Sequence, residues 1–347
     1  MALQFIEISG DHRELGRQYG ESARVPIQSF VAFLHEWSGA SRSRVTAAVW
    51  SFLPLLRHFA PEQVAEIEGL AEGASIPFED AVLLQLRGEV LPRLPAEGCT
   101  SFAVTPGSTR TGGAIIGQTS DMDAAWGRHL LVVHAKPTGA PSYLTWTFAG
   151  QLGYHGLNDR GLAHFANNLP VLARHSPPQP GLSHYPFKKR LLGLEHRTDV
   201  ERLFASYPFC SPGNYMLCTA ASEIFDVEAV PGESRQPDYP GRGYLVHTNH
   251  YLDTGWAAEA GGPPTYSDTH VRFERMSRLL AESPPLDAQS VRELLADHCP
   301  QAAPICRHGE VDRMSTVGAL VADPVAGELH VSEGPPCEGR WTVYRLR

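Results

Sequence analysis

The sequence lacks the features of membrane, secreted and nucleic-acid-binding proteins. No apolar run approaches the roughly 20 residues that cross a bilayer, and the first apolar stretch carries Glu7 and no basic leader, unlike a secretory signal. Lysine and arginine number 29 against 38 acidic residues, a net charge of −9, with no basic block that phosphates would follow. We therefore expect a soluble, cytoplasmic protein whose partners include neither a membrane nor a nucleic acid.

Cysteine is also scarce. Six cysteines in 347 residues form no CxxC pair, which excludes a disulfide scaffold. Two short clusters carry metal-ligand residue types: the 247–250 stretch has two histidines, and Cys306 stands two residues before His308. Neither supplies the paired spacing of a zinc site. We expect no metal and no resident cofactor.

The hydrophobic pattern changes its period near residue 98. Helical patterns fill the first part, and from there strand patterns alternate with short blocks of helix, which favours α+β antiparallel sheets covered by helices. We expect one compact unit made of a helical segment, 1–98, and a sheet-rich segment, 99–347. The predicted helices are 10–37, 45–58, 61–73, 77–91, 186–195, 199–206, 269–282 and 287–297. The predicted strands are 101–104, 113–119, 129–136, 143–148, 162–168, 214–218, 223–230, 243–249, 315–322, 328–332 and 341–346.

At the change of period stands the run Gly98-Cys99-Thr100-Ser101. If the chain is cut before Cys99, that residue gains a free α-amine, which titrates near pH 7.7 to 8.0, next to a thiol that titrates near about 8.5. The amine then serves as the base for its own thiol, as in N-terminal threonine nucleophiles. Gly98 leaves its carbonyl open to attack because it has no Cβ. The plain alternative is a small buried apolar cysteine.

Further motifs in chain order resemble the acyl-coenzyme A:isopenicillin N acyltransferase family, a group of N-terminal-nucleophile hydrolases. The resemblance spans nearly the whole chain and includes Ser267 with Arg272 in a late helix. The motifs are 68–73 and 78–80 in the helical segment, the Gly98-Cys99 junction, 117–121, 247–250, 267–276 and 304–313.

The resemblance implies an αββα sandwich that matures by autocleavage between Gly98 and Cys99, with the 1–98 segment retained. It implies Cys99 as the nucleophile, Asp121 as a carboxylate that holds the new ammonium, Asn249 as an oxyanion donor and Arg313 as a partner of Asp121 or of a substrate carboxylate. Each of the last three also has an ordinary structural reading. Asp121 suits a turn, Asn249 a backbone cap and Arg313 a surface ion pair.

The function implied is hydrolysis or transfer of the acyl group of a small N-acyl compound through a thioester. A coenzyme A ester is a possible co-substrate, although no basic phosphate-binding loop supports it. The alternatives are a coenzyme A-dependent N-acyltransferase and an uncleaved, non-catalytic binding protein on the same fold. Thr119, Ser120 and Asp312 depart from the family's motifs, so we expect a different substrate from that of the enzyme that names the family. The sequence predicts no particular oligomeric state.

Overall fold

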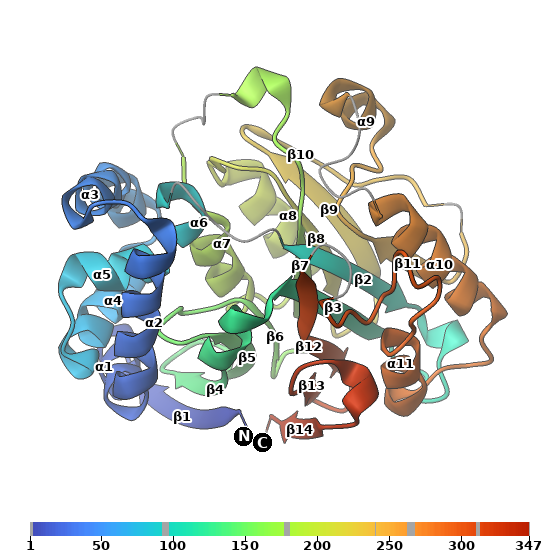
Figure 1. The fold of residues 1–347 in the computed structure, drawn as a ribbon. Coiled ribbons are helices and arrows are strands. Elements are labelled where there is room, and N and C mark those ends of the chain that lie inside the picture. Colours follow the sequence, from blue (N-terminus) through green and yellow to red (C-terminus); the bar gives the residue numbers. More distant parts are fainter. Residues whose placement is uncertain are drawn as a thin grey trace.

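The computed structural model describes residues 3–91, 97–176, 181–239, 241–261, 268–309 and 313–346. It has four layers, with helices outside two β-sheets that face each other (Figure 1). The predicted α+β, αββα architecture is confirmed. Ser267 and Asp312 lie outside the described residues.

Two sheets form the centre of the molecule. The eight-stranded sheet has the order β1-β4-β5-β6-β7-β8-β9-β10 and the six-stranded sheet the order β11-β2-β3-β12-β13-β14. Strands of the first sheet are β1 (Gln4–Gly10), β4 (Leu130–Pro137), β5 (Tyr143–Phe148), β6 (His155–Asn158), β7 (Ala163–Asn168), β8 (Gly213–Cys218), β9 (Ile224–Val230) and β10 (Glu233–Arg235). Strands of the second are β2 (Gly98–Val104), β3 (Ile115–Asp123), β11 (Tyr244–His247), β12 (Met314–Asp323), β13 (Glu328–Ser332) and β14 (Trp341–Arg345).

Strands β2 and β3 pack against β7 and β8, so the centres of the two sheets meet. All seven residues of β2 are buried, the polar Thr100 and Ser101 among them, because α10 covers one face of the strand and the other sheet covers the opposite face. A hydrogen bond of 3.0 Å from Gln118 Nε2 to the carbonyl of Ala166 ties the sheets together. The start of β2 therefore lies deep between the two sheets.

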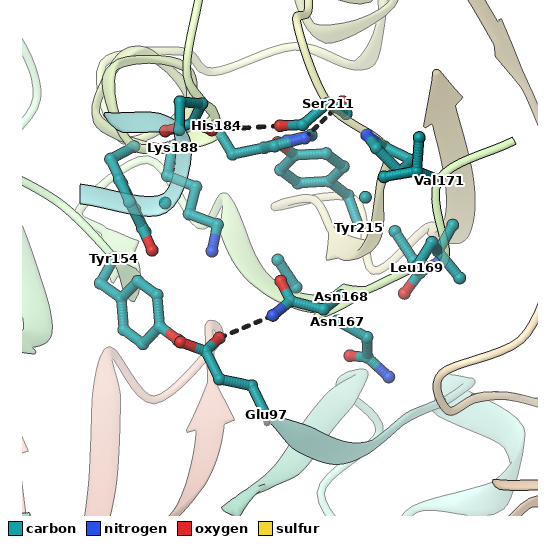
Figure 2. A pocket seen from close by; sticks show the side chains of 17 residues that line it. Glu97, Tyr154, Asn167, Asn168, Leu169, Val171, His184, Lys188, Ser211 and Tyr215 are labelled. Carbon is teal, nitrogen blue, oxygen red and sulfur yellow. Dashed lines mark hydrogen bonds between the residues drawn. The ribbon is translucent and has the colours of Figure 1, made fainter. Parts of the chain in front are cut away.

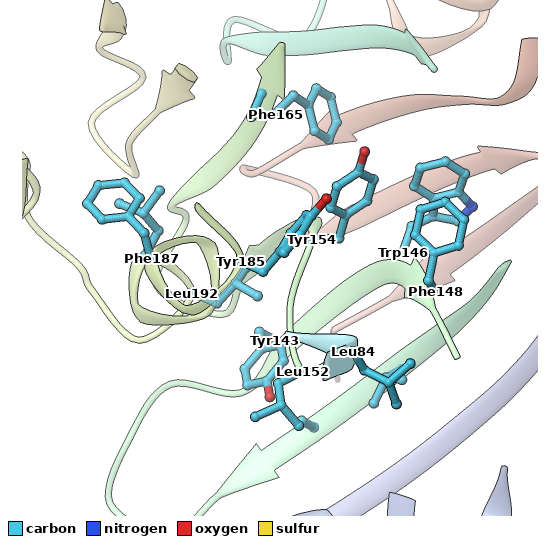
Figure 3. Close-up of a cluster of buried hydrophobic side chains, with 14 of the residues drawn as sticks. Leu84, Tyr143, Trp146, Phe148, Leu152, Tyr154, Phe165, Tyr185, Phe187 and Leu192 are labelled. Carbon is cyan, nitrogen blue, oxygen red and sulfur yellow. The ribbon is translucent and has the colours of Figure 1, made fainter. Parts of the chain in front are cut away.

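The helices form the outer layers. The helices of the first part, together with α7 and α8, cover the eight-stranded sheet, and α10 and α11 cover the six-stranded one (Figure 1). Aromatic and aliphatic side chains from α5, α7 and the strands fill the space under the first layer (Figure 3). The helices are α1 (His12–Ser22), α2 (Arg24–Ser38), α3 (Arg42–Phe59), α4 (Pro61–Ala74), α5 (Phe78–Leu84), α6 (Arg87–Val90), α7 (His184–Leu191), α8 (Arg197–Ser206), α9 (Thr254–Ala260), α10 (Thr269–Glu282) and α11 (Ala288–Leu295). Short 3-10 turns are η1 (Pro106–Ser108), η2 (Ala124–His129), η3 (Ala173–His175) and η4 (Pro336–Glu338). In the described ranges, no helix combines the length and apolarity needed to traverse a bilayer.

The part of the chain before Cys99 shares its core with the part after it. Strand β1 pairs in parallel with β4, at the edge of the eight-stranded sheet. Buried hydrogen bonds join Tyr19 to the carbonyl of Phe148 at 3.2 Å and Gln63 to that of Pro186 at 2.9 Å. A cut at residue 98 would leave these contacts unbroken.

Helices α1 and α4 touch backbone to backbone through glycines. A methyl group at Gly69 would overlap the carbonyl oxygen of Arg13, and one at Gly16 would overlap that of Glu66. Because both obstacles are main-chain atoms, no side chain can turn aside to make room. Glycine is therefore required where these two helices cross.

We predict that Gly69→Ala lowers the free energy of unfolding by about 3 kcal/mol, at the upper end of overpacking costs. Gly107→Ala is the matched control, since a methyl there meets nothing within 4 Å, and it should change stability by less than about 0.5 kcal/mol. Urea denaturation of both variants measures the difference. Equal stabilities would show that α1 and α4 separate at little cost.

Candidate active site

Three of the four predicted site residues, Cys99, Asp121 and Asn249, converge because three strands bring their ends to one place. In the antiparallel register Gly98 pairs with Asp121 and Cys99 with Ser120. On the other side of β2, His247 of β11 pairs with Ser101. Asn249, two residues later, thus comes level with Cys99. The register alone explains how residues 150 positions apart meet.

Cys99 is held at both of its backbone groups. Its N–H donates to Asn249 Oδ1 at 2.9 Å, and its carbonyl accepts from Arg272 Nη1 at 2.6 Å. The residue is buried, with 2% of its surface exposed. The nitrogen that cleavage would turn into an α-amine is therefore fixed in position in the intact chain.

The side-chain oxygen of Asn249 makes this contact. Both of its partners, the Cys99 N–H and Arg272 Nη2 at 2.9 Å, are donors, so only the amide oxygen can face them. The amide nitrogen donates in turn to the carbonyl of Asn168 at 3.1 Å. The amide oxygen of Asn249 thus orients the nitrogen of Cys99 in the intact chain, and the oxyanion-donor role expected from the sequence stays a prediction for its amide nitrogen.

Arg272, which the sequence analysis included only as part of a motif, is the centre of the polar contacts. It is fully buried on α10 and also donates to Thr100 Oγ1 at 3.0 Å. Its charge is offset by Asp268, whose Oδ2 lies 3.3 Å from Nε of Arg272. Asp268 also forms an ion pair with Arg307. A buried guanidinium with this set of acceptors suits a positioning role, since losing it would leave several groups unpaired.

Asp121 lies beside the Gly98-Cys99 junction. Its Oδ1 accepts from Thr316 Oγ1 at 2.6 Å and its Oδ2 lies 3.3 Å from Nε of Arg307. A Cβ built on Gly98 would stand 3.5 Å from Oδ2, so the carboxylate borders Gly98 directly. Burial raises the pKa of Asp121 to about 6, with the charges of Arg307 and Arg272 opposing that rise.

Arg313 is not with the other three residues. It is exposed, with φ of 64°, at the residue before β12, and the described partners of Asp121 are Arg307 and Thr316. The ion pair expected of Arg313 is thus made by Arg307. Both arginines lie in the one motif of the closing segment, and nothing in its spacing showed which of them would turn inward.

The thiol of Cys99 is not ionised in the intact chain. Burial, followed by the negative charges of Asp121 and Glu97, raises its pKa to about 12. Within the described ranges no histidine hydrogen-bonds to Cys99. The sulfur would therefore need another base close by to become a nucleophile.

A cavity of about 200 Å³ opens next to Glu97 (Figure 2). Its walls come from α6, α7, β7, β8 and the residues before β6. The carboxylate of Glu97 accepts from Asn168 Nδ2 at 2.8 Å, and the amine of Lys188 points into the space, 4.2 Å from the ring centre of Tyr154. Burial lowers the pKa of Lys188 to about 8. The cavity thus presents donors to an acidic group, and Glu97 occupies part of it.

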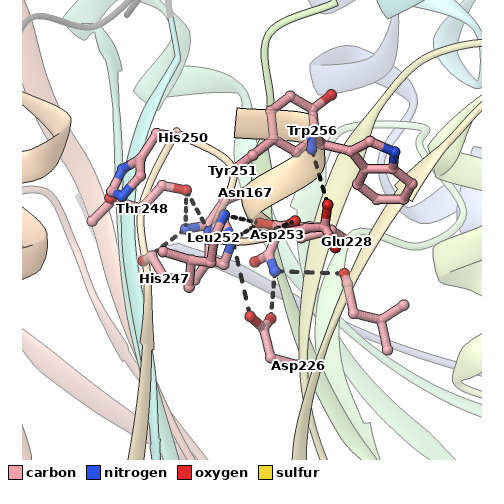
Figure 4. A network of polar contacts seen from close by, with 12 residues as sticks. Asn167, Asp226, Glu228, His247, Thr248, His250, Tyr251, Leu252, Asp253 and Trp256 are labelled. Atoms are coloured by element: carbon pink, nitrogen blue, oxygen red, sulfur yellow. Dashed lines mark hydrogen bonds and ion pairs between the residues drawn. The ribbon is translucent and has the colours of Figure 1, made fainter. Parts of the chain in front are cut away.

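A second polar network fixes the segment that carries Asn249 (Figure 4). His247 Nε2 lies 2.9 Å from Glu228 Oε1, and its Nδ1 lies 2.8 Å from the carbonyl of Thr248. Both partners are acceptors, so the ring carries two protons. Burial acts to lower the pKa of His247, but the charges of Asp226 and Glu228 outweigh it and raise the pKa. Glu228 also accepts from the backbone of Leu252, which anchors the chain on both sides of Asn249.

Comparison with known proteins identifies the family of this chain. Residues 108–337 match the model described as acyl-coenzyme A:6-aminopenicillanic acid acyl-transferase, about two thirds of the chain. The chain belongs to this acyl-transferase family. The resemblance seen in the sequence is confirmed.

Three solved structures are similar to this member of the acyl-transferase family. A mutant conjugated bile acid hydrolase from Clostridium perfringens has 12% identity and a TM-score of 0.45, over 72% of this chain and 97% of that one. Penicillin V acylase from Agrobacterium tumefaciens has 14% identity and a TM-score of 0.42, over 68% and 83%. Penicillin G acylase from Alcaligenes faecalis has 11% identity and a TM-score of 0.39, over 56% and 51%.

Proposed function

We propose that the chain cuts itself between Gly98 and Cys99 and then works as an N-terminal-cysteine amide hydrolase. In the first step the sulfur gives up its proton and bonds to the carbonyl carbon of Gly98. The Cys99 nitrogen then leaves that carbon and takes up a proton, so Gly98 becomes a thioester and Cys99 gains an α-amine. Water cleaves the thioester, which releases the Gly98 carboxylate and restores the thiol.

The observation that carries this proposal is the double anchoring of Cys99. Its nitrogen is held by Asn249 and its carbonyl by Arg272, while the residue before it is a glycine against Asp121. Any buried residue needs partners for its backbone N–H and carbonyl, but at Cys99 two side chains, Asn249 and Arg272, contact these groups. Cleavage would remove Gly98 from beside Asp121 and leave that carboxylate facing the new amine.

The new amine supplies the base that the buried thiol lacks. It must be neutral to accept a proton, and the nearby charges of Arg272 and Asp121 act on it in opposite directions. The guanidinium disfavours the ammonium form and the carboxylate favours it. A free α-amine titrates near 7.7 to 8.0, a range suited to a general base at neutral pH.

In turnover the Cys99 thiolate attacks the carbonyl of an N-acyl substrate. The amine that leaves takes up the proton, the acyl group stays on sulfur as a thioester, and water releases it as an acid. Asn249 keeps the amine of Cys99 in place throughout, and Arg272 keeps its carbonyl in place. Transfer to a second amine would use the same thioester, and a coenzyme A thioester could load it in place of an amide.

The cavity beside Glu97 is the proposed acyl-binding site. In the intact chain the acyl side of the scissile bond is Glu97-Gly98, so a substrate acyl group bound to the same sulfur takes their place. Asn168, which donates to the Glu97 carboxylate, and Lys188, whose amine points into the same cavity, would then meet the far end of the substrate. We propose a small N-acyl compound whose acyl group ends in a carboxylate.

We predict that Lys188→Met lowers kcat/KM for such substrates by about tenfold or more, the value of one charge-assisted hydrogen bond. Glutaryl and butyryl 4-nitroanilides form the matched pair, and only the glutaryl compound should be affected. The preference should also fall as pH rises through about 8, where Lys188 loses its charge. Lys136→Met, at an exposed position of β4, is the control. Equal losses on both substrates would contradict an acid-binding role for Lys188.

Hydrolysis is tested with the processed protein and a panel of N-acyl 4-nitroanilides. The expected result is release of 4-nitroaniline together with an acyl adduct on the 99–347 fragment after rapid acid quench. Binding of these compounds without release or adduct would leave a protein that binds and does not catalyse, against the proposal.

A further inference from the structure

A cluster of two cysteines and two histidines lies outside the site described above. His298 follows α11, Cys306 and His308 lie in the segment before β12, and Cys337 is in η4. Their side-chain ligand atoms all lie within 4.8 Å of one another. Cys306 is buried and the other three are exposed at the rim.

Four of the six distances within the cluster are close to the edges of a tetrahedron around one ion, and all six are within 4.8 Å. The sulfurs of Cys306 and Cys337 are 3.6 Å apart, and Nε2 of His298 is 3.1 Å from Nε2 of His308. The same His308 nitrogen lies 3.7 Å from Cys306 Sγ and 3.2 Å from Cys337 Sγ. Zinc bonds of about 2.3 Å to sulfur and about 2.0 to 2.1 Å to nitrogen give tetrahedral edges of about 3.8 Å between sulfurs, about 3.4 Å between nitrogens and about 3.5 Å between the two types.

Hydrogen bonding does not account for this arrangement. Nε2 of His308 faces three groups at once, yet one ring nitrogen carries at most one proton and can satisfy one of them. A cation at the centre satisfies all four atoms together. Two thiolates with two neutral imidazoles also balance the charge of a divalent ion.

We propose that His298, Cys306, His308 and Cys337 bind one Zn²⁺ in a closed, structural site. Two sulfur and two nitrogen ligands in a tetrahedron favour zinc among the common divalent ions. All four positions are filled by the protein, which leaves none for a reacting water. The ion would tie the segment before β12 to the one after β13.

The position of the proposed zinc site next to Arg307 indicates which part of the protein it stabilises. Arg307 stands between two of the ligands, and its backbone N–H donates to Thr316 Oγ1 at 2.9 Å while its side chain pairs with Asp121. Fixing Cys306 and His308 fixes Arg307 from both sides. The zinc site is thus a positioning device for the Asp121 carboxylate, and its occupancy does not depend on cleavage at Cys99.

The test is the metal content of the full chain purified from zinc-supplemented cells under reducing conditions and dialysed against metal-free buffer. We expect about one zinc per chain by plasma mass spectrometry for the natural sequence and for Cys299→Ser, and less than about 0.2 for Cys337→Ser and His298→Ala. Cys299 is the matched control because it is an exposed cysteine in the same segment but outside the cluster. Replacing zinc by Co²⁺ should give the visible bands of a tetrahedral site and thiolate-to-cobalt charge transfer, both lost in Cys337→Ser.

Three results would overturn the proposal. The first is a zinc content below about 0.2 per chain after zinc is added to the reduced natural protein, and the second is an equal content in Cys337→Ser. The third is a disulfide: protein purified without reductant and then denatured would show two fewer reactive thiols than the six in the sequence. Retention of all six thiols with bound zinc supports the metal site.

Discussion

Cys99→Ala is expected to yield a single uncut chain of 347 residues with no amidase activity. The methyl group fits the buried position but cannot attack the Gly98 carbonyl, so neither the thioester nor the α-amine forms. Turnover should fall by more than about 10⁴-fold, as when other enzymes lose their nucleophile. Intact-mass measurement and a 4-nitroanilide assay report the two effects together.

The control is Cys218→Ala, which removes a buried cysteine from β8 of the other sheet. It should be cut and active, because its thiol is outside the proposed machinery. If Cys99→Ala were still cut between residues 98 and 99, a contaminating protease would be responsible. The self-cleavage proposed for the chain would then be contradicted.

Asn249→Asp is expected to have the second largest effect. An aspartate can still accept from Cys99 and Arg272, but it places a negative charge beside the new amine and repels the carbonyl of Asn168. An opposite charge at this distance raises the pKa of an amine by about 1 to 3 units. Because the neutral amine is the base, the rise of kcat/KM with pH should move upward by that amount, with a loss of about tenfold or more at pH 7.

Asn249→Ala separates charge from loss of contact. It removes the acceptor without adding a carboxylate, so activity should fall while the pH profile stays at or below that of the natural protein. Full pH profiles of processed protein measure both variants. An Asn249→Asp profile that does not move upward would show that Asn249 does not act on the α-amine.

The sequence predicted the architecture well because its periodicity is set by burial. Strand 143–148 and helix 269–282 coincide with β5 and α10. Strand β1 was missed because its short run at the chain start, half exposed, has too little pattern to read. Helix 10–37 is in fact two helices, since the backbone of Ala23 departs from helical geometry between α1 and α2.

The order of the motifs along the chain predicted Cys99, Asp121 and Asn249 as site residues, and the structure places these three together. Their detailed contacts depend on orientation, which no spacing encodes. Arg307 is buried against Asp121, whereas Arg313, six positions later and directly before β12, is exposed. The acceptor role of Asn249 likewise follows from Arg272, which approaches from α10.

The His298, Cys306, His308 and Cys337 cluster shows a second limit of spacing. Sequence analysis looked for paired ligands close in the chain and expected no metal. The fold supplies the second pair from the segment after α11 and from η4, 8 and 31 residues from Cys306. Long-range assembly of this kind is visible only in three dimensions.

N-terminal sequencing of the purified, active natural protein tests the central claim most directly. We expect two sequences in equal amounts, one from the start of the chain and one reading Cys-Thr-Ser from Cys99. The two fragments should elute together without denaturant, since the contacts of Tyr19 and Gln63 hold them. An active preparation that shows only the first sequence would contradict the account.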